Sequence, residues 1–253
     1  MKKLENKVCV ITGAAGGIGQ ATAELFLSHG ASLMLVDLKE DDLKKISRNM
    51  DAERVAFFAA DVSKPGDTRK FTEATLSKFG RIDVVFLNAG IEGKFLSISE
   101  YPEDVFDRII AVNLKGVWLG CQNLLPVMSK GGSAIITSSV AGLKGFPHLG
   151  AYVASKHGVV GIMRTAALEF ADKGIRVNSI HPGPVNNRMM RSIEEQIHPD
   201  EPAASQKDFE ASVPFKRYAE NSEIADLALF LACDDSKYIT GTTQVIDGGM
   251  IIG

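Results

Sequence analysis

The chain has 253 residues, of which 45% are hydrophobic and 23% are charged, and its formal net charge is −3 at pH 7. This composition is ordinary for a globular protein with a sizeable core, and the length favours one large domain, residues 1–253, over two small ones. The basic residues are scattered, which argues against a nucleic-acid partner, and no apolar run reaches the roughly 18 residues of a membrane span, so we expect a cytoplasmic protein without membrane contact.

Short apolar runs alternate along the chain with amphipathic stretches of helical length. The predicted strands are 7–12, 31–37, 54–60, 82–88, 133–139, 175–180 and 243–247, and the predicted helices lie near 17–29, 40–49, 65–79, 102–129, 151–172 and 221–233. The strand runs are mostly continuous in apolar character, as in parallel strands covered on both faces. The alternation predicts βαβ units with right-handed crossovers in a single Rossmann-like, doubly wound parallel α/β sheet of about seven strands, with helices on both faces.

The first predicted strand runs directly into a glycine-rich turn, and a helix follows. Glycine lets the backbone turn sharply and approach a ligand without a Cβ in the way. The N-terminus of the helix offers unpaired N–H groups and a positive dipole end to a pyrophosphate. Within a βαβ unit this arrangement predicts nucleotide binding, although a turn that serves only tight packing is the alternative. The cofactor-binding residues predicted here are Gly13, Gly16, Gly17, Ile18 and Gly19.

Asp37 ends the second predicted strand roughly 20 residues beyond this turn, and Leu38 follows it in the predicted cofactor site. An acid at this place bonds the ribose hydroxyls of NAD, and its charge repels the 2′-phosphate of NADP. Gly16 puts no basic side chain into the turn to offset Asp37, and Lys39 alone is not expected to reverse the preference. We therefore predict NAD as the cofactor; an aspartate that only makes a turn is the alternative.

Tyr152 and Lys156, in the stretch AYVASKHG, lie four residues apart in a predicted helix and share one of its faces. A phenol with a pKa near 10 is a poor base at neutral pH, and lowering that pKa by roughly 3 units takes about 4 kcal/mol. One positive charge at about 4 Å supplies this only at a protein-like dielectric constant, not in water. We therefore expect Lys156 to lower the pKa of Tyr152 if the pair lies in a cleft, as general acid–base groups do; an idle surface pair is the alternative.

Taken together, the motifs resemble those of the short-chain dehydrogenase/reductase family, in its single-domain form, along essentially the whole chain. The pattern T-G-x-x-x-G-x-G begins at Thr12, the Asn-Ala-Gly motif is Asn88 to Gly90, and Y-x-x-x-K is Tyr152 with Lys156. Asn113 in the long fourth helix, Ser139 at the end of the fifth strand and the segment RVNSIHPG at 176–183 complete the likeness.

The resemblance implies an oxidoreductase that moves a hydride between nicotinamide and the carbon of a secondary alcohol or ketone. Tyr152 is then the general acid/base beside Lys156, and Ser139 bonds the substrate oxygen, favoured over Ser138 by its spacing from Tyr152. Asn113 would hold a water joined to Lys156. Asparagine is a poor residue inside a helix, so its position suits a local distortion.

The resemblance also implies cofactor contacts beyond the glycine turn. Asp61 would bond the adenine amino group, Val62 would pack on the adenine ring, and Val185 would bond the nicotinamide carboxamide through its backbone. The other implied contacts are Asn88, Ala89, Gly90, Tyr152, Lys156, Pro182, Gly183 and Asn187. In two places the chain departs from the family: Leu87 stands before Asn88 where an asparagine is frequent, and Asn187 replaces a usual threonine, although asparagine can still bond a carboxamide or phosphate.

The residues expected around the substrate are largely apolar, which favours a small or medium apolar alcohol or ketone because methionine adapts to irregular shapes. They are Ser139, Phe146, His148, Leu149, Met189 and Met190, with Ile91 and Glu92 after the Asn-Ala-Gly turn. A solvated loop position is the alternative for His148. The proline-rich segment 181–220 is expected to be irregular, with a substrate lid at about 185–215.

Cys9, Cys121 and Cys233 lie far apart, and their odd number argues against a disulfide framework, so we expect buried free thiols. The histidines lack metal-ligand spacing, and no metal is predicted.

The C-terminal stretch VIDGGMIIG is unusually apolar for a tail and is expected in an interface between copies; the resemblance implies a homotetramer. Three other functions are alternatives: a non-catalytic NAD-sensing module, an NADP-preferring 3-oxoacyl-type carbonyl reductase, and an epimerase or dehydratase. This chain does not match the glycine spacing and the separate substrate domain of epimerases and dehydratases.

Overall fold

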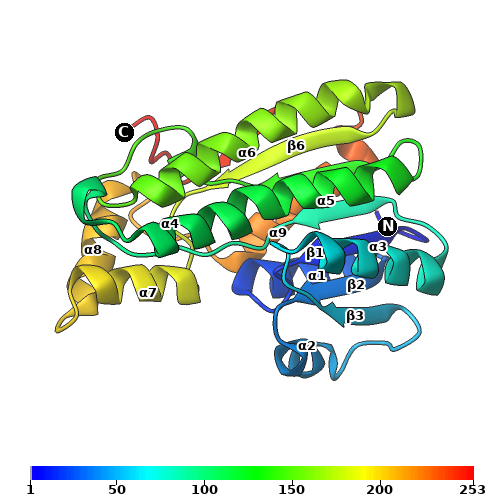
Figure 1. Cartoon of the computed structure of the whole chain (residues 1–253), viewed down its shortest axis with the longest axis horizontal. Coiled ribbons are helices and arrows are strands. Elements are labelled where there is room, and N and C mark those ends of the chain that lie inside the picture. Colours follow the sequence, from blue (N-terminus) through cyan, green and yellow to red (C-terminus); the bar gives the residue numbers. More distant parts are fainter. Residues whose placement is uncertain (1) are drawn as a thin grey trace.

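Seven strands form one sheet in the order β3-β2-β1-β4-β5-β6-β7 within residues 2–253, the part of the chain that the computed structural model describes (Figure 1). All neighbouring strands are parallel. The strands are β1 (Val8–Thr12), β2 (Ser32–Asp37), β3 (Val55–Ala59), β4 (Val84–Leu87), β5 (Ser133–Thr137), β6 (Arg176–Pro182) and β7 (Thr243–Ile246). The predicted doubly wound α/β fold is confirmed, and the predicted strand bounds differ from the observed ones by no more than two residues.

Helices cover both faces of the sheet (Figure 1). The helices on one face are α1 (Gly17–Ser28), α2 (Glu40–Ser47) and α9 (Asn221–Ala232), and those on the other are α3 (Pro65–Phe79), α5 (Gly116–Leu124) and α6 (Gly150–Glu169). Neighbouring residues of a strand face opposite layers: Cys9 and Ile11 of β1 join the core under α1 and α9, whereas Val10 joins the core under α5 and α6. This two-sided burial explains why the strand sequences are continuously apolar.

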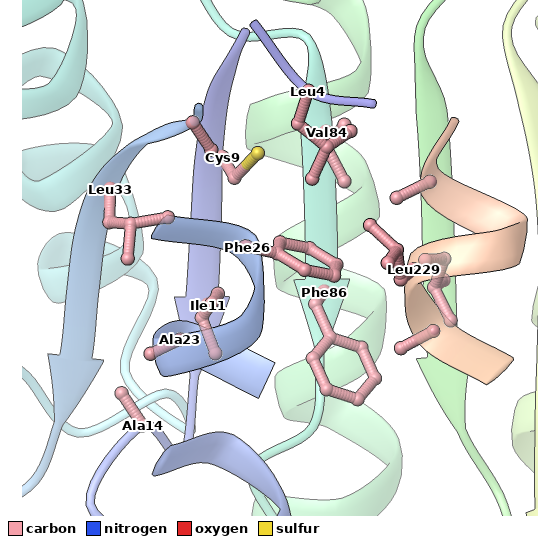
Figure 2. Close-up of a cluster of buried hydrophobic side chains, with 14 of the residues drawn as sticks. Leu4, Cys9, Ile11, Ala14, Ala23, Phe26, Leu33, Val84, Phe86 and Leu229 are labelled. Atoms are coloured by element: carbon pink, nitrogen blue, oxygen red, sulfur yellow. The ribbon is translucent and has the colours of Figure 1, made fainter. Parts of the chain in front are cut away.

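The core beneath α1 and α9 is built around aromatic and aliphatic side chains that meet over β4. Figure 2 shows Phe26 of α1 and Leu229 of α9 lying close to Phe86 of β4, and none of the three is more than 6% exposed. Burial of one such side chain contributes about 1.5–3 kcal/mol. This packing fixes α1, and with it the glycine-rich turn that precedes α1, against the carboxyl ends of the strands.

The predicted long helix at 102–129 is interrupted at the position of Asn113. It consists of α4 (Glu103–Ile109), a π-helical segment (Ile110–Lys115) and α5. Such π-helical segments widen the turn and are frequent at functional sites. The predicted local distortion at Asn113 is therefore confirmed.

The expectation that residues 181–220 are irregular is wrong, because this segment contains α7 (Arg188–Ile197) and α8 (Pro202–Ser212). The Asn187 side chain caps α7 by accepting a hydrogen bond from the Met190 amide at 3.3 Å. Pro202 stands in the first turn of α8, where a missing N–H has no consequence. Pro199, Pro202 and Pro214, interpreted as markers of a loop, lie at the ends of these two helices.

The three cysteines are free and buried, as predicted. Within residues 2–253 no helix combines the length and the apolar character needed to cross a membrane.

Gly19, in the first turn of α1, offers a test of the packing around the glycine-rich turn. A Cβ added there would overlap the carbonyl oxygen of Gly13. We expect Gly19→Ala to lower the free energy of unfolding by about 1–3 kcal/mol, even though alanine favours a helix over glycine by about 1 kcal/mol. Urea denaturation followed by circular dichroism measures this difference.

Gly66, near the start of α3, supplies the matched control, because an added Cβ there has no neighbouring atom of the described chain within 4 Å. Gly66→Ala should be neutral or slightly stabilising. Equal unfolding free energies for the two variants would contradict the packing described here.

Candidate active site

A cavity of about 570 Å³ opens at the carboxyl ends of the strands. It lies where the strand order reverses between β1 and β4, which is the usual ligand site of open α/β sheets. Most residues predicted to bind the cofactor line it: Gly13, Gly16, Gly17, Ile18, Asp37, Leu38, Asp61, Val62, Asn88, Ala89, Gly90, Tyr152, Lys156, Pro182, Gly183, Val185 and Asn187. Gly19 does not line the cavity, because it packs against the turn itself.

The glycine turn leaves backbone N–H groups of α1 facing this cavity. Gly16 is the N-cap of α1, and no side chain of residues 2–253 caps the helix there. A Cβ on Gly16 would have only the Gly13 oxygen nearby, at 3.4 Å, so the backbone stays open to a ligand. Gly13 is required for another reason, since its φ is +65° and an added Cβ would lie 2.8 Å from the Ala89 Cα. The turn can therefore hold an anionic group at the helix N-terminus.

The Asp37 carboxylate is anchored to the glycine turn at the end of β2. Its Oδ2 accepts a hydrogen bond from the Ala15 amide at 2.9 Å, and its Oδ1 accepts one from the Leu38 amide at 2.7 Å. Each carboxylate oxygen keeps a further lone pair for a ligand hydroxyl. Arg108, a basic side chain on the same cavity wall, does not offset this charge because it pairs with Asp61 at 3.3 Å.

Asp61 is held as a hydrogen-bond acceptor at the end of β3. Its Oδ1 accepts from the amide and the hydroxyl of Ser63 at 3.0 and 2.6 Å, and its Oδ2 accepts from Arg108. Burial by itself raises the pKa of Asp61, but the hydrogen bonds from Ser63 and Arg108 outweigh it and lower the pKa below its ordinary value. A group that bonds this side chain must therefore be a donor.

Asn88 links the ends of β1, β4 and β5 by hydrogen bonds. Its backbone N–H donates to the Thr12 hydroxyl at 3.0 Å, and its side-chain Nδ2 donates to the Gly13 carbonyl oxygen at 3.3 Å. The Thr137 hydroxyl in turn donates to Asn88 Oδ1 at 3.1 Å. The turn after β4 thereby connects the glycine turn of β1 to the end of β5.

Tyr152 and Lys156 lie together on the cavity wall that α6 forms. The Lys156 ammonium lies 5.5 Å from the centre of the Tyr152 ring and donates to the Thr137 carbonyl at 2.8 Å. Lys156 is only 3% exposed, and this burial lowers its pKa to about 8. The predicted sharing of one helix face is confirmed.

The structure differs from the expectation that Lys156 lowers the pKa of Tyr152. Burial raises the pKa of Tyr152 to about 12; the Ser139 hydroxyl opposes this shift, and the Glu92 carboxylate adds to it. Desolvation of the phenolate is therefore the largest influence on this group.

The structure distinguishes the two candidate serines. Ser138 is 2% exposed, and its hydroxyl donates to the Lys156 carbonyl at 2.9 Å, so it is committed to holding α6. The Ser139 Oγ accepts from the Ala141 amide at 3.1 Å and lines the cavity near Tyr152.

Asn113 links the turn after β4 to α6. Its Oδ1 accepts from the Ile91 amide and its Nδ2 donates to the Ile91 carbonyl, both at 2.9 Å, and Nδ2 also lies 3.2 Å from the Ser155 hydroxyl. The π-helical segment turns this fully buried side chain inward.

Apolar side chains close the end of the cavity beyond Tyr152. The expected Phe146, Leu149, Met189 and Met190 line it, together with Val140, Ile193, Phe209 and Met250. His148 does not line it: its backbone has φ +66°, and its ring lies 5.0 Å from the Phe95 ring at the surface. Sequence patterns missed Phe209 and Met250, because these side chains reach the cavity from α8 and from the C-terminus.

The C-terminal stretch closes part of this chain's own core, and its predicted contact with another copy stays a prediction. Met250 is buried against Val140 and Val213, and its carbonyl accepts from the Lys144 ammonium at 3.2 Å. Ile252 remains 88% exposed.

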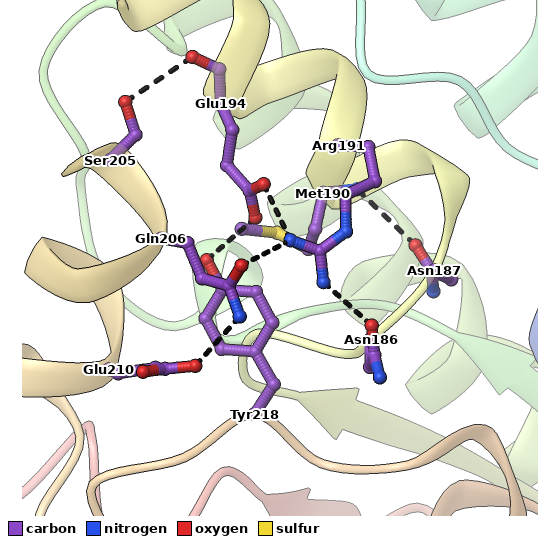
Figure 3. Close-up of polar contacts among 9 residues, drawn as sticks. All are labelled: Asn186, Asn187, Met190, Arg191, Glu194, Ser205, Gln206, Glu210 and Tyr218. Atoms are coloured by element: carbon purple, nitrogen blue, oxygen red, sulfur yellow. Dashed lines mark hydrogen bonds and ion pairs between the residues drawn. The ribbon is translucent and has the colours of Figure 1, made fainter. Parts of the chain in front are cut away.

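The wall formed by α7 and α8 is held by a buried polar cluster (Figure 3). Glu194 of α7 is 2% exposed and accepts from the Tyr218 hydroxyl at 2.9 Å and from Arg191 at 2.7 Å. Arg191 also donates to Gln206 of α8 at 2.8 Å, and the Ser205 hydroxyl donates to the Glu194 carbonyl at 3.3 Å. These bonds make the two helices one unit.

The helix α7 is also attached to the opposite wall of the cavity. Arg188 pairs with Glu92 at 3.2 Å. The Gln196 side chain accepts from the Phe95 amide at 3.0 Å and donates to the Gly93 carbonyl at 3.2 Å. The segment that the sequence predicted as a lid thus bridges the cavity in this structure. Among residues 2–253 no group of three or more histidine, cysteine, aspartate or glutamate side chains is arranged to hold a metal ion.

Known proteins resemble this chain over almost its entire length. Residues 13–251 match the sequence family described as enoyl-(acyl carrier protein) reductase. Levodione reductase of Leifsonia aquatica is 38% identical over 254 residues, covering 98% of this chain and 95% of that protein. A crystal structure of levodione reductase matches with a TM-score of 0.95 at 37% identity and covers 98% of both chains.

Two further relatives are named for other activities. The 3-oxoacyl-[acyl-carrier-protein] reductase FabG of Thermotoga maritima is 38% identical, with 99% of this chain and 100% of that protein covered. Cyclohexanol dehydrogenase of an Acinetobacter species is 36% identical, with 97% and 95% covered.

The buried Lys156 provides a test of the electrostatics of this site. Its pKa is about 8 in the folded protein and near 10.5 when exposed. Between these pH values the unfolded chain holds a proton on this lysine that the folded chain does not, so the free energy of unfolding decreases as pH falls from 10.5 to 8. We expect Lys156→Met to be more stable than the wild type at pH 7, by on the order of 3 kcal/mol, and this advantage to vanish as pH rises from 8 to 10.5. Chemical denaturation across that range measures it.

Lys130→Met is the control, because Lys130 is exposed at the surface. Its stability difference from the wild type should not change through the same pH window. A Lys156→Met advantage that is absent at pH 7, or that grows with pH, would contradict the burial of an ammonium here.

Proposed function

The chain belongs to the short-chain dehydrogenase/reductase family of oxidoreductases, and from this we propose that it interconverts a secondary alcohol and a ketone with NAD(H) as its cofactor. The observation that carries the proposal is the meeting of Tyr152, Lys156 and Ser139 in one cavity with the glycine turn and Asp37. These groups match the two needs of the reaction, a proton carrier at the substrate oxygen and a site for a dinucleotide.

Tyr152 is the proposed proton carrier. A bound nicotinamide would supply the hydride acceptor for oxidation and the hydride donor for reduction, and its oxidised form would add a positive charge. In reduction the ketone oxygen needs a proton, and the neutral phenol, whose pKa burial raises to about 12, is the form that donates it. In oxidation the phenolate must take the proton, and the ammonium of Lys156 is the chain's own nearby cation.

Ser139 and Asn113 have supporting roles in the proposal. The Ser139 hydroxyl donates to the substrate oxygen, since its Oγ already accepts from the Ala141 amide. The Lys156 ammonium spends one of its three N–H donors on the Thr137 carbonyl. A water held by Asn113 and joined to Lys156 stays a prediction for the path by which the proton reaches solvent.

The residues around the cavity fit a dinucleotide. The open amides at the start of α1 suit its pyrophosphate, Asp61 suits the adenine amino group because its side chain only accepts, and Asp37 suits the ribose hydroxyls. We propose NAD rather than NADP because the Asp37 carboxylate is held in place by two backbone amides. Arg108, which lines the same cavity, pairs with Asp61 and not with Asp37. The backbone of Val185 and the side chain of Asn187 remain proposed contacts of the nicotinamide carboxamide.

The proposed substrate is an uncharged, largely apolar secondary alcohol or ketone of small or medium size. The walls beyond Tyr152 carry Phe146, Leu149, Met189, Met190 and Phe209, and these match apolar carbon rather than phosphate or sugar hydroxyls. The names of two relatives, levodione reductase and cyclohexanol dehydrogenase, agree in pointing to ring ketones and ring alcohols. We therefore propose a cyclic substrate as the first class to assay.

We propose a homotetramer in the cytoplasm. Apolar side chains stand exposed on the outer helices and on the edge strand β7: Trp118 at 55%, Leu168 at 81% and Val245 at 42%. Such patches favour contacts between copies. Light scattering that gives the mass of one chain would contradict the tetramer.

The alternative within the family is an NADP-preferring 3-oxoacyl-type reductase, which the FabG relative favours. Against it stand Asp37 and the apolar walls of the cavity.

Tyr152→Phe tests the catalytic assignment. Removing the hydroxyl leaves the ring in place but removes the proton carrier, so we expect turnover of cyclohexanol with NAD⁺ to fall by about 10³-fold or more. Binding of NADH, followed by its fluorescence, should stay within roughly 3-fold of the wild type, because that change is below about 1 kcal/mol. Tyr238→Phe, at a fully exposed tyrosine, is the control and should keep full activity. Substantial activity in Tyr152→Phe would remove Tyr152 from the role.

Asp37→Ala tests the cofactor preference. Loss of charged hydrogen bonds to the ribose should lower kcat/KM with NADH by about 10- to 100-fold, and loss of the charge should raise kcat/KM with NADPH. Asp41→Ala, on the exposed side of α2, should change neither value. A wild-type enzyme whose KM is lower for NADPH than for NADH would refute the preference.

A further inference from the structure

His181 is a fully buried histidine that the proposed reaction does not use. It lies on β6, which pairs with β5, and Ser139 follows the end of β5. Its Nδ1 lies 2.8 Å from the Ser139 carbonyl oxygen, and its Nε2 lies 2.8 Å from the hydroxyl of Ser179, which is also fully buried. Both ring nitrogens are therefore occupied by fixed partners.

The partners determine which nitrogen carries the proton. A carbonyl oxygen can only accept, so Nδ1 must donate to Ser139. The Ser179 hydroxyl can donate, so Nε2 of the neutral ring accepts from it. Burial lowers the pKa of His181, with the Lys156 ammonium adding to the shift, which agrees with a neutral ring.

The His181 side chain makes a hydrogen bond beyond the last backbone bond between β5 and β6. The Ser138 amide donates to the Ile180 carbonyl at 2.9 Å, which is the last backbone bond between β5 and β6. Pro182 has no N–H with which to extend that ladder. The His181 side chain instead donates to the carbonyl of Ser139, in the segment that follows β5.

Ser139 is held at two points as a result. Its carbonyl accepts from His181 and from the Gly142 amide at 2.8 Å, and its Oγ accepts from the Ala141 amide. The two carbonyl bonds fix the backbone, and the bond from the Ala141 amide fixes the place of Oγ.

We propose that His181, oriented by Ser179, is a positioning residue that sets the place of the Ser139 hydroxyl for the reaction. This inference rests on the proposed function of Ser139. Because His181 touches neither the cavity nor Tyr152, its loss should lower kcat more than it changes KM or cofactor binding. A misplacement of about 1 Å can lower a rate by roughly 100-fold.

Two substitutions of His181 distinguish a role in positioning Ser139 from a role in core packing alone. The amide nitrogen of asparagine takes nearly the place of Nδ1, so His181→Asn keeps the donor to Ser139, whereas the longer glutamine directs its amide toward Ser179. With cyclohexanol and NAD⁺, we expect kcat of His181→Asn to stay within about 5-fold of the wild type and that of His181→Gln to fall about 10- to 100-fold. NADH binding, measured by fluorescence, should stay within roughly 3-fold in both.

A double-mutant cycle then asks whether the effect passes through Ser139. In a Ser139→Ala background, measured by product accumulated at high enzyme concentration, His181→Gln should cause no further loss. Equal kcat for His181→Asn and His181→Gln, or an undiminished loss in the Ser139→Ala background, would overturn the proposal. If His181→Gln does not fold, Ser179→Ala takes its place, and a wild-type kcat for that variant would be the overturning result.

A measurement that does not depend on turnover tests the role of His181 even if the proposed substrates do not react. In the enzyme labelled with ¹⁵N-histidine, the signal that disappears in His181→Asn should be that of a neutral ring with the proton on Nδ1 at pH 8. A signal with the proton on Nε2 would overturn the assignment. An unreactive wild-type enzyme with the expected signal would instead count against the proposed function alone.

Discussion

A continuous chain of hydrogen bonds joins the two ends of the cavity. It begins at the Thr12 hydroxyl, which accepts from the Asn88 amide, and passes through the Asn88 side chain to the Thr137 hydroxyl. The Thr137 carbonyl then accepts from the Lys156 ammonium. Where the strand order reverses, the connections that follow β1 and β4 run to opposite faces of the sheet and leave a crevice between them. These hydrogen bonds tie the glycine turn, the turn after β4 and α6 together across that crevice.

Burial shifts the pKa values of both titratable groups of the site. It raises the pKa of Tyr152 to about 12 and lowers that of Lys156 to about 8, so at pH 7 the phenol is neutral while Lys156 still carries its proton. A positive charge brought in by a ligand would act at the same low effective dielectric, where it counts for more than in water. The site is therefore arranged so that the acidity of Tyr152 responds to what is bound.

Two rigid supports flank these groups. On one side, the bonds of Glu194 and Arg191 make α7 and α8 one wall, which Arg188 and Gln196 attach to the segment after β4. On the other side, Ser179 and His181 of strand β6 hold Ser139 through a hydrogen bond to its carbonyl oxygen. Polar groups buried at this depth are costly unless they are satisfied, so such networks specify one geometry.

The sequence alone was sufficient for the fold and for the glycine turn with Asp37 beside it, because both arise from local patterns. Continuous apolar runs indicate parallel strands, and a glycine turn between a strand and a helix with Asp37 after the next strand is a contiguous signal. It also indicated the pairing of Tyr152 with Lys156 and the distortion at Asn113, since helical spacing and propensity are local as well. Only the tertiary structure decided that 181–220 holds two helices, that Phe209 and Met250 reach the cavity while His148 does not, and that burial dominates the pKa of Tyr152. Those properties depend on which distant segments cover a side chain, and no nearby sequence pattern carries that information.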